Sequence, residues 1–145
     1  MNAPPRLPGQ VGGDLRYLLN DFARTPGVRH AVLLSMDGLA MLWSDGLGRD
    51  TAERLAALTC SALGTGRALA KEVGESDQRG GQLICQFPSG GHFVVGAIGM
   101  TAGIGVSVEP GANLPAVVND LQRLIGGVGA RLAPQPLHAP GGGQA

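Results

Sequence analysis

The stretch from Asp50 to Gly74 constrains the fold of this chain more than any other segment. Asp50 is a favourable N-cap residue, Glu53 follows three positions later as in a capping box, and Gly74 suits the end of a helix. The sequence therefore predicts one long helix over these residues. We expect the apolar stripe of this helix to pack on a β-sheet of the same chain. At about 100° per residue, that stripe comprises Leu55, Leu58, Ala62, Leu69 and Val73.

The opposite side of this helix carries small side chains where a solvated face would carry long charged ones. This small-residue row comprises Ala57, Ser61, Gly64 and Ala68, and the charged residues Glu53, Arg54, Arg67, Lys71 and Glu72 lie around it. Two glycines inside the helix, Gly64 and Gly66, each cost about 1 kcal/mol relative to alanine. A helix with one large-residue face and one small-residue face indicates two packing partners, its own sheet and a second chain. A plain alanine-rich surface helix is the alternative.

Apolar runs separated by turn signals predict five β-strands, over residues 30–36, 39–43, 82–87, 92–98 and 103–108. Asp37-Gly38 lies between the first two runs and predicts a two-residue hairpin, because both turn positions need positive φ. The first run is almost continuously apolar, which is typical of a strand covered on both faces. In the last strand Gly103, Gly105 and Ser107 share a face, where a helix can approach closely.

Two further helices flank these elements. Asp14 is expected to cap a short helix that ends before Pro26-Gly27, and Asn113 to cap a final helix that runs to Leu132. The resulting order is α-β-β-α-β-β-β-α, an α/β fold with helices on both faces of the sheet. Residues 1–13 and 133–145 are rich in proline and glycine, so we expect a disordered arm and tail around a domain over residues 14–132.

Charge and composition exclude several classes of function. A net charge of zero, with 11 basic and 11 acidic residues, argues against nucleic-acid and membrane-surface binding. No apolar run approaches the roughly 18 residues of a membrane helix, and no leader is evident, so we expect a cytoplasmic protein without direct membrane insertion. Cys60 and Cys85 form no Cys-x-x-Cys motif, and we expect them to be reduced core thiols.

Motifs that carry catalysis or bind cofactors are absent from the sequence. There is no G-x-x-x-x-G-K-[ST] phosphate loop and no G-x-S-x-G nucleophile elbow. Residues 64–67 read G-T-G-R, but inside a helix their N–H groups are already bonded and cannot hold phosphate. The three histidines show no metal-ligand spacing. We therefore expect no catalytic, cofactor-binding or metal-binding residues.

Three segments, taken in order, resemble the roadblock/dynein light chain family. They are G-V-R-H-A-V-L-L-S-M-D-G-L from Gly27, A-E-R-L-A-A-L-T-C-S-A-L-G-T-G-R-A-L-A from Ala52, and G-I-G-V-S-V-E-P-G-A-N-L from Gly103. The resemblance covers residues 14–132 and is strongest to bacterial MglB-like members, including those of actinobacterial conservon operons. It implies a profilin-like α/β sandwich with a sheet of five antiparallel strands.

The resemblance also implies a function. Members of the family dimerise by pairing their central helices and joining their third strands, and they regulate or scaffold small Ras-like GTPases without binding nucleotide. For this chain it implies a homodimer, and an edge strand at Leu83, Ile84 and Cys85 would leave backbone groups open for such pairing. The small-residue row would serve either the dimer contact or the GTPase, with Arg54 and Arg67 as GTPase contacts.

Other partners and functions stay open at this point. In conservon systems a sensor-kinase-like protein is a further partner, and partners could recruit this chain to a membrane. The alternative function is a small-molecule sensing domain, since profilin-like and PAS-like sheets can hold ligands. An enzyme is the least favoured class, because no converging set of polar residues is evident.

Overall fold

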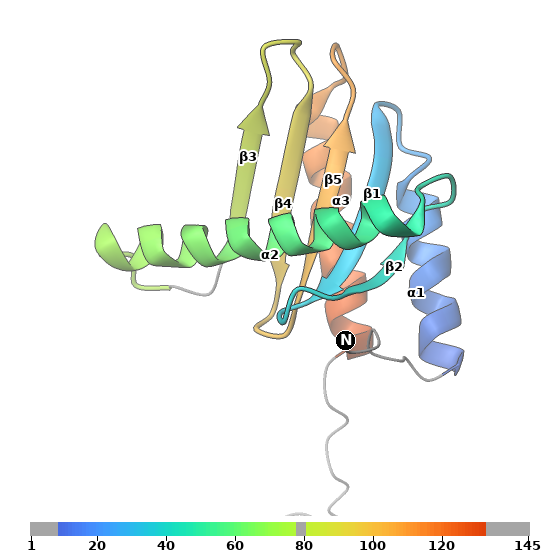
Figure 1. Ribbon diagram of the computed structural model, residues 1–145, viewed down its shortest axis with the longest axis horizontal. Helices are drawn as coiled ribbons and strands as arrows, with labels where there is room; N and C mark the ends of the chain where they lie inside the picture. Colours follow the sequence, from blue (N-terminus) through green and yellow to red (C-terminus); the bar gives the residue numbers. More distant parts are fainter. Residues whose placement is uncertain (1–8, 78–80, 133–145) are drawn as a thin grey trace, which may run out of the picture.

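The computed structural model of this chain describes residues 9–77 and 81–132. Its elements follow the predicted order, α-β-β-α-β-β-β-α (Figure 1). They are α1 (Gly9–Phe22), β1 (Val28–Ser35), β2 (Ala40–Trp43), α2 (Arg49–Glu72), β3 (Gln82–Gln86), β4 (His92–Ile98), β5 (Ala102–Val108) and α3 (Leu114–Leu132).

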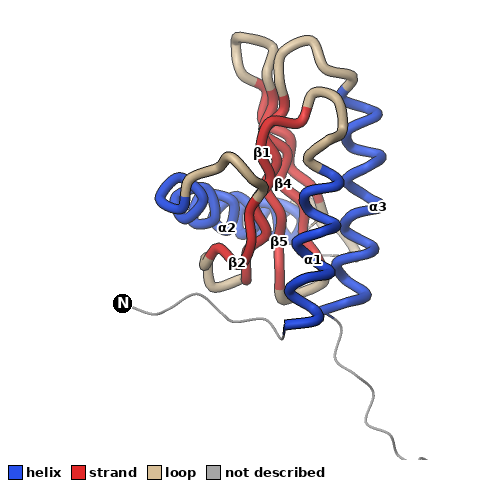
Figure 2. The backbone as a smooth tube through the Cα atoms, turned by 90° about the vertical axis from the view of Figure 1, so that its right-hand side faces the viewer, coloured by secondary structure: helices blue, strands red, loops and turns tan. Residues whose placement is uncertain are grey.

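The strands form one antiparallel sheet in the order β2-β1-β5-β4-β3, so β2 and β3 are its edges. Figure 2 shows α2 on one face of this sheet and α1 with α3 on the other. Strand β1 is buried from both sides. Its Ala31 and Leu33 belong to the core under α1 and α3, whereas Val32 and Leu34 pack under α2. The prediction of a strand covered on both faces is confirmed.

The larger part of the core lies between the sheet, α1 and α3. Both helices place an apolar stripe at helical spacing on the sheet: Leu15, Leu19 and Phe22 from α1, and Val117, Leu121, Leu124 and Val128 from α3. The predicted cap of the last helix is confirmed, because Asn113 Oδ1 accepts a hydrogen bond from the Ala116 N–H at 3.1 Å.

Two other predicted caps are wrong. Helix α1 begins at Gly9, so Asp14 lies inside it, and residues 9–13 of the expected arm are helical. Val11, in that segment, packs against the core. The cap of α2 is Gly48, which makes no side-chain hydrogen bond, and Asp50 instead lies in the first turn, where its charge favours the helix dipole. Residues 1–8 and 133–145, the rest of the expected arm and the tail, lie outside the described residues.

The hairpin between β1 and β2 is longer than the two-residue turn predicted from Asp37-Gly38. Four residues, 36–39, connect the strands, and Ser35 N–H donates to Leu39 O across the turn at 3.0 Å. Gly38 has the expected positive φ of 87°. A register shift between Leu33 and Leu34 accompanies the longer turn, which explains why spacing alone misjudged it.

Candidate interaction site on helix α2 and strand β3

Helix α2 lies on the sheet through small residues. Its buried positions are Ala52, Ala56, Thr59 and Leu63. Gly103 and Gly105 of β5 lie beneath it: a Cβ on Gly103 would come within 2.5 Å of Leu63 Cδ1, and a Cβ on Gly105 within 2.5 Å of Thr59 Oγ1. The predicted close approach of a helix to this face of the last strand is confirmed.

Most of the apolar stripe expected to face the sheet does not do so, although Leu55 packs against the core under α2. Leu58, Leu69 and Val73 are 65%, 55% and 72% exposed. They lie about a quarter turn around the helix from the buried positions, on a lateral side of α2. Periodicity identifies residues that share a face, but not which face meets the sheet. Here Gly103 and Gly105 of β5 leave room for Leu63 and Thr59, so that side of the helix meets the sheet and Leu58, Leu69 and Val73 are left at the side.

The small-residue row of Ala57, Ser61, Gly64 and Ala68 is exposed on the side of α2 away from the sheet. Nothing lies within 4 Å of a Cβ placed on Gly64. By contrast, a Cβ on Gly66 would come within 2.9 Å of Leu83 Cδ1. Packing within the chain therefore accounts for Gly66 but not for Gly64.

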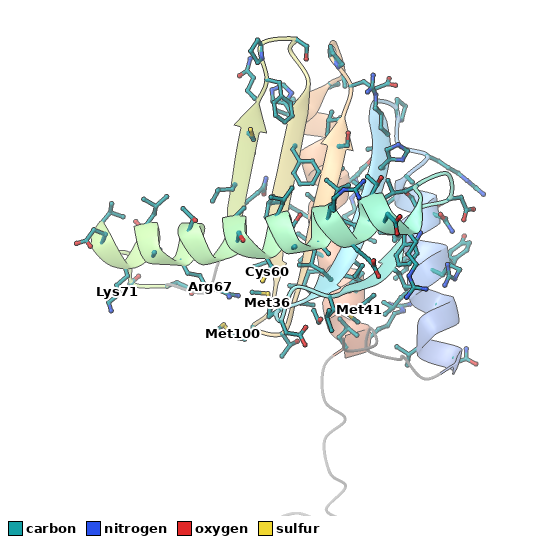
Figure 3. The ribbon with its side chains drawn as sticks, in the orientation of Figure 1. Met36, Met41, Cys60, Arg67, Lys71 and Met100 are labelled. Atoms are coloured by element: carbon teal, nitrogen blue, oxygen red, sulfur yellow. The ribbon has the colours of Figure 1, made fainter. Side chains whose placement is uncertain are left out.

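The structure does not bring Arg54 and Arg67 together. Arg54 is exposed near the start of α2, where its Nη2 donates to Thr51 Oγ1 at 3.3 Å. In Figure 3, Arg67 leaves α2 on the same side as Cys60 and Lys71. Its Nε and Nη2 are buried and have no hydrogen-bond partner among the described residues. Of these two arginines, Arg54 is the one that is exposed beside the small-residue row.

Strand β3 is an open edge of the sheet. Leu83 is half-buried, Ile84 is 48% exposed, and Cys85 is exposed rather than in the core as expected. The other cysteine, Cys60, is half-buried, and its Sγ donates to Met36 O at 3.3 Å. Both are free thiols. The prediction of a core thiol is wrong for Cys85, because alternation along an edge strand does not ensure that anything covers it. Cys60, by contrast, packs against the core under α2.

A hollow of about 140 Å³ lies between α2 and the β3 edge. Its lining residues are Leu58, Thr59, Ala62, Leu83, Ile84, Cys85, Phe93 and Val95. The lining is almost wholly apolar apart from the hydroxyl of Thr59, which is buried and has no hydrogen-bond partner among the described residues. One hydroxyl provides too few polar contacts to orient a polar metabolite.

Hollows at the other end of the molecule involve side chains that are already paired. One of about 460 Å³ and another of about 260 Å³ share Thr25 and Asp120. The Asp120 carboxylate accepts from Thr25 Oγ1 at 3.2 Å and lies 3.7 Å from Arg123 Nη2. Among the described residues there is also no cluster of three or more His, Cys, Asp or Glu side chains that could hold a metal ion.

This architecture defines a class of protein: a single five-stranded antiparallel sheet between one long helix and a helix pair, with an exposed helix face and an open edge strand. The comparisons identify the family. The model of the Roadblock/LC7 domain matches residues 15–86. A Roadblock/LC7 domain from Streptomyces avermitilis is 32% identical, with a TM-score of 0.61 over 78% of this chain and 96% of that one. The chain belongs to the Roadblock/LC7 family.

Other solved structures share the fold. A second Roadblock/LC7 structure from Streptomyces avermitilis is 28% identical, with a TM-score of 0.72 over 82% of this chain and 98% of that chain. The gliding protein MglB of Thermus thermophilus is 19% identical, with a TM-score of 0.77 over 90% of this chain and 97% of that chain. A comparison with curated proteins found no match. None of the helices described here is long and apolar enough to cross a membrane.

The sequence did not lead us to expect that the lateral side of α2, with Leu58, Leu69 and Val73, is an exposed apolar surface. The signal that could have revealed it was already in β5, where Gly103 and Gly105 alternate on one face and leave room for a helix to approach closely. Placing Thr59 and Leu63 over these glycines would have turned Leu58 and Leu69 away from the sheet.

Proposed function

We propose that this chain is a homodimeric, non-enzymatic regulator or scaffold for a small Ras-like GTPase in a bacterial signalling system. Membership of the Roadblock/LC7 family and the MglB-like fold support this proposal. The observation that carries it is Gly64. A glycine inside a helix costs about 1 kcal/mol relative to alanine, and no contact with the residues that the structure describes requires this one. A partner that approaches the α2 backbone closely would account for it.

The dimer would form through the β3 edge and the lateral side of α2. Leu83, Ile84 and Cys85 leave an edge strand whose unpaired backbone groups can pair with a second copy. Beside it, Leu58, Leu69 and Val73 expose apolar side chains, and contact of such surface with water is energetically unfavourable. Covering both surfaces with one symmetric contact is the simplest way for a homodimer to remove them from solvent.

The GTPase would then dock on the small-residue row. Ala57, Ser61, Gly64 and Ala68 face away from the sheet and would stay accessible once the lateral side is covered. They leave room for close approach of a flat surface, and Arg54 beside them would attract acidic side chains of the GTPase. Because rim charges act mainly on the rate of encounter, Arg54→Glu should weaken binding most at low salt. Arg67→Glu should have less effect, since Nε and Nη2 of its guanidinium group are buried.

The test is capture of purified small Ras-like GTPases of the source organism by the full chain. We expect one of them to co-elute when loaded with a non-hydrolysable GTP analogue. Gly64→Trp should abolish co-elution and leave the chain dimeric. Tyr17→Trp, at an exposed position of α1, is the matched control and should change nothing. If no GTPase binds in either nucleotide state, or if Gly64→Trp binds like the wild type, the proposed docking site is wrong.

A further inference from the structure

Helix α2 is too long for the sheet that it crosses. Its 24 residues extend about 36 Å at 1.5 Å per residue. Five strands at about 4.8 Å spacing span only about 19 Å between the outer strand axes. Figure 1 shows the consequence, since α2 continues past the β3 edge. Gly66 lies over Leu83 of that edge strand, so residues 67–72 and the cap Val73 project beyond the sheet.

The projecting part of α2 carries apolar side chains that are largely exposed. Leu69 and Val73 are 55% and 72% exposed. They lie on the same lateral side of the helix as Leu58 and Ala62, which form one wall of the hollow at the β3 edge. Leu69 and Val73 are apolar, like the lining of the hollow, and they lie on the same side of α2 as the hollow. They are too far along the helix to fill the hollow of their own chain.

A two-fold axis beside Ile84 would bring them together. Antiparallel pairing of β3 with β3 of a second copy about that axis places Leu83 opposite Cys85 of the partner. Because α2 passes over Leu83, the partner's projecting helix end would pass over Cys85 and Phe93. Both residues line the hollow. The same two-fold rotation beside Ile84 places the Leu69 side chains of the two copies next to each other at the axis.

The size of the hollow suits this occupant. Its volume is about 140 Å³, and an apolar cavity of about 150 Å³ holds a molecule of benzene. One branched aliphatic side chain fits such a space. We propose that the hollow between α2 and β3 is a socket that Val73 of a second copy fills, with Leu69 of both copies packed at the two-fold axis. This inference rests on the homodimer of the proposed function and adds which residue closes which site.

Cross-linking between two distinguishable chains tests the contact. One chain carries Cys60→Ser, Cys85→Ser and Val73→Cys. The other is enlarged by a tag, carries Cys60→Ser and keeps Cys85. After mixing and exchange, a short bis-maleimide should join Cys85 to the new cysteine, giving a product of mixed size on a denaturing gel. Ala68→Cys in place of Val73→Cys is the control, because it faces away from the sheet, and should give little product.

A double-mutant cycle tests whether Val73 fits the socket. Its readout is the dimer dissociation constant, and a variant that merely loses its structure would not regain affinity in the second step. Ala62→Leu fills the hollow from within and should raise the dimer dissociation constant about tenfold or more, the cost of overpacking. Adding Val73→Ala to this variant should restore most of the affinity, because the smaller side chain at position 73 leaves room for the larger one at position 62. Ala57→Leu, on the outward face, should leave the dissociation constant unchanged.

The outcomes separate this inference from the proposed function. A monomeric mass for the wild type would contradict both. A dimeric mass with no mixed cross-link from Val73→Cys, or with equal product from Ala68→Cys, would overturn the socket and leave the homodimer standing. A dimer in which Cys85 reacts with a bulky maleimide as fast as in denatured chain would also overturn it, since the hollow would then be open for a different partner.

Discussion

At the scale of single residues, the glycines in α2 and in the strand beneath it are explained by different contacts. Gly103 and Gly105 allow α2 to touch the sheet, and a Cβ on Gly105 would meet both Thr59 Oγ1 at 2.5 Å and Phe93 Cζ at 2.8 Å. Gly66 clears the side chain of Leu83. A Cβ on Gly64 would meet no described residue, so no packing contact in that part of the chain offsets its cost to the helix.

This difference predicts opposite effects of the same substitution. Gly64→Ala should stabilise the isolated chain by about 1 kcal/mol, because alanine is the better helix former and meets no atom. Gly105→Ala should destabilise it by about 1–3 kcal/mol, because the buried Thr59 and the half-buried Phe93 must move. Urea unfolding followed by circular dichroism measures both. A destabilised Gly64→Ala would show that the row already has a packing partner within the chain.

At the scale of elements, the sequence specifies the order and type of every helix and strand, because apolar periodicity and turn residues are local signals. The Asn113 cap and the close approach over Gly103 and Gly105 were predictable for the same reason. The orientation of α2 was not. Leu58 and Leu69 gave the strongest stripe, but contact with glycines of a distant strand decided which side is buried.

The candidate site was predictable only in part. The small-residue row and the open β3 edge were identified from residue types, and the structure leaves both exposed. The hollow at this edge was not predictable, because Phe93 and Val95 come from a neighbouring strand and Leu58 from a helix. The burial of the Nε and Nη2 atoms of Arg67 likewise depends on tertiary packing.

Strand β3 yields a prediction about its exposed backbone. Phe87 N–H donates to Gly91 O and Gly81 O accepts from Ala97 N–H, both at 2.9 Å. Because these groups alternate in direction along a strand, the N–H of Ile84 points away from β4. Ile84→Pro should therefore abolish dimer formation and keep the bonds between β3 and β4.

Light scattering coupled to gel filtration measures the mass of this variant, and thermal unfolding reports whether it is folded. Ile84→Val keeps the N–H and serves as the control that should stay dimeric. A folded, dimeric Ile84→Pro would show that the chains associate without joining their edge strands.

At the scale of the whole molecule, the limits of the domain follow from α1 and α3. Deleting residues 1–8 and 133–145 should leave the unfolding midpoint unchanged, because those segments are rich in proline and glycine and poor in apolar side chains. Deleting residues 1–13 should lower it by a few degrees, since the loss includes Val11 and the first turn of α1. Calorimetry of both deletions decides where the domain begins, and equal midpoints would favour a start at Asp14.

The central claim is that the lateral side of α2, together with the β3 edge, belongs to a second copy of the chain. Sedimentation equilibrium of the full chain at tens of micromolar tests it most directly. We expect twice the chain mass of 14.7 kDa for the wild type, and the single chain mass once Leu69→Asp and Val73→Asp are combined, because two charges would then have to be buried at the contact. A monomeric wild type, or a doubly substituted chain that stays dimeric, would contradict the account.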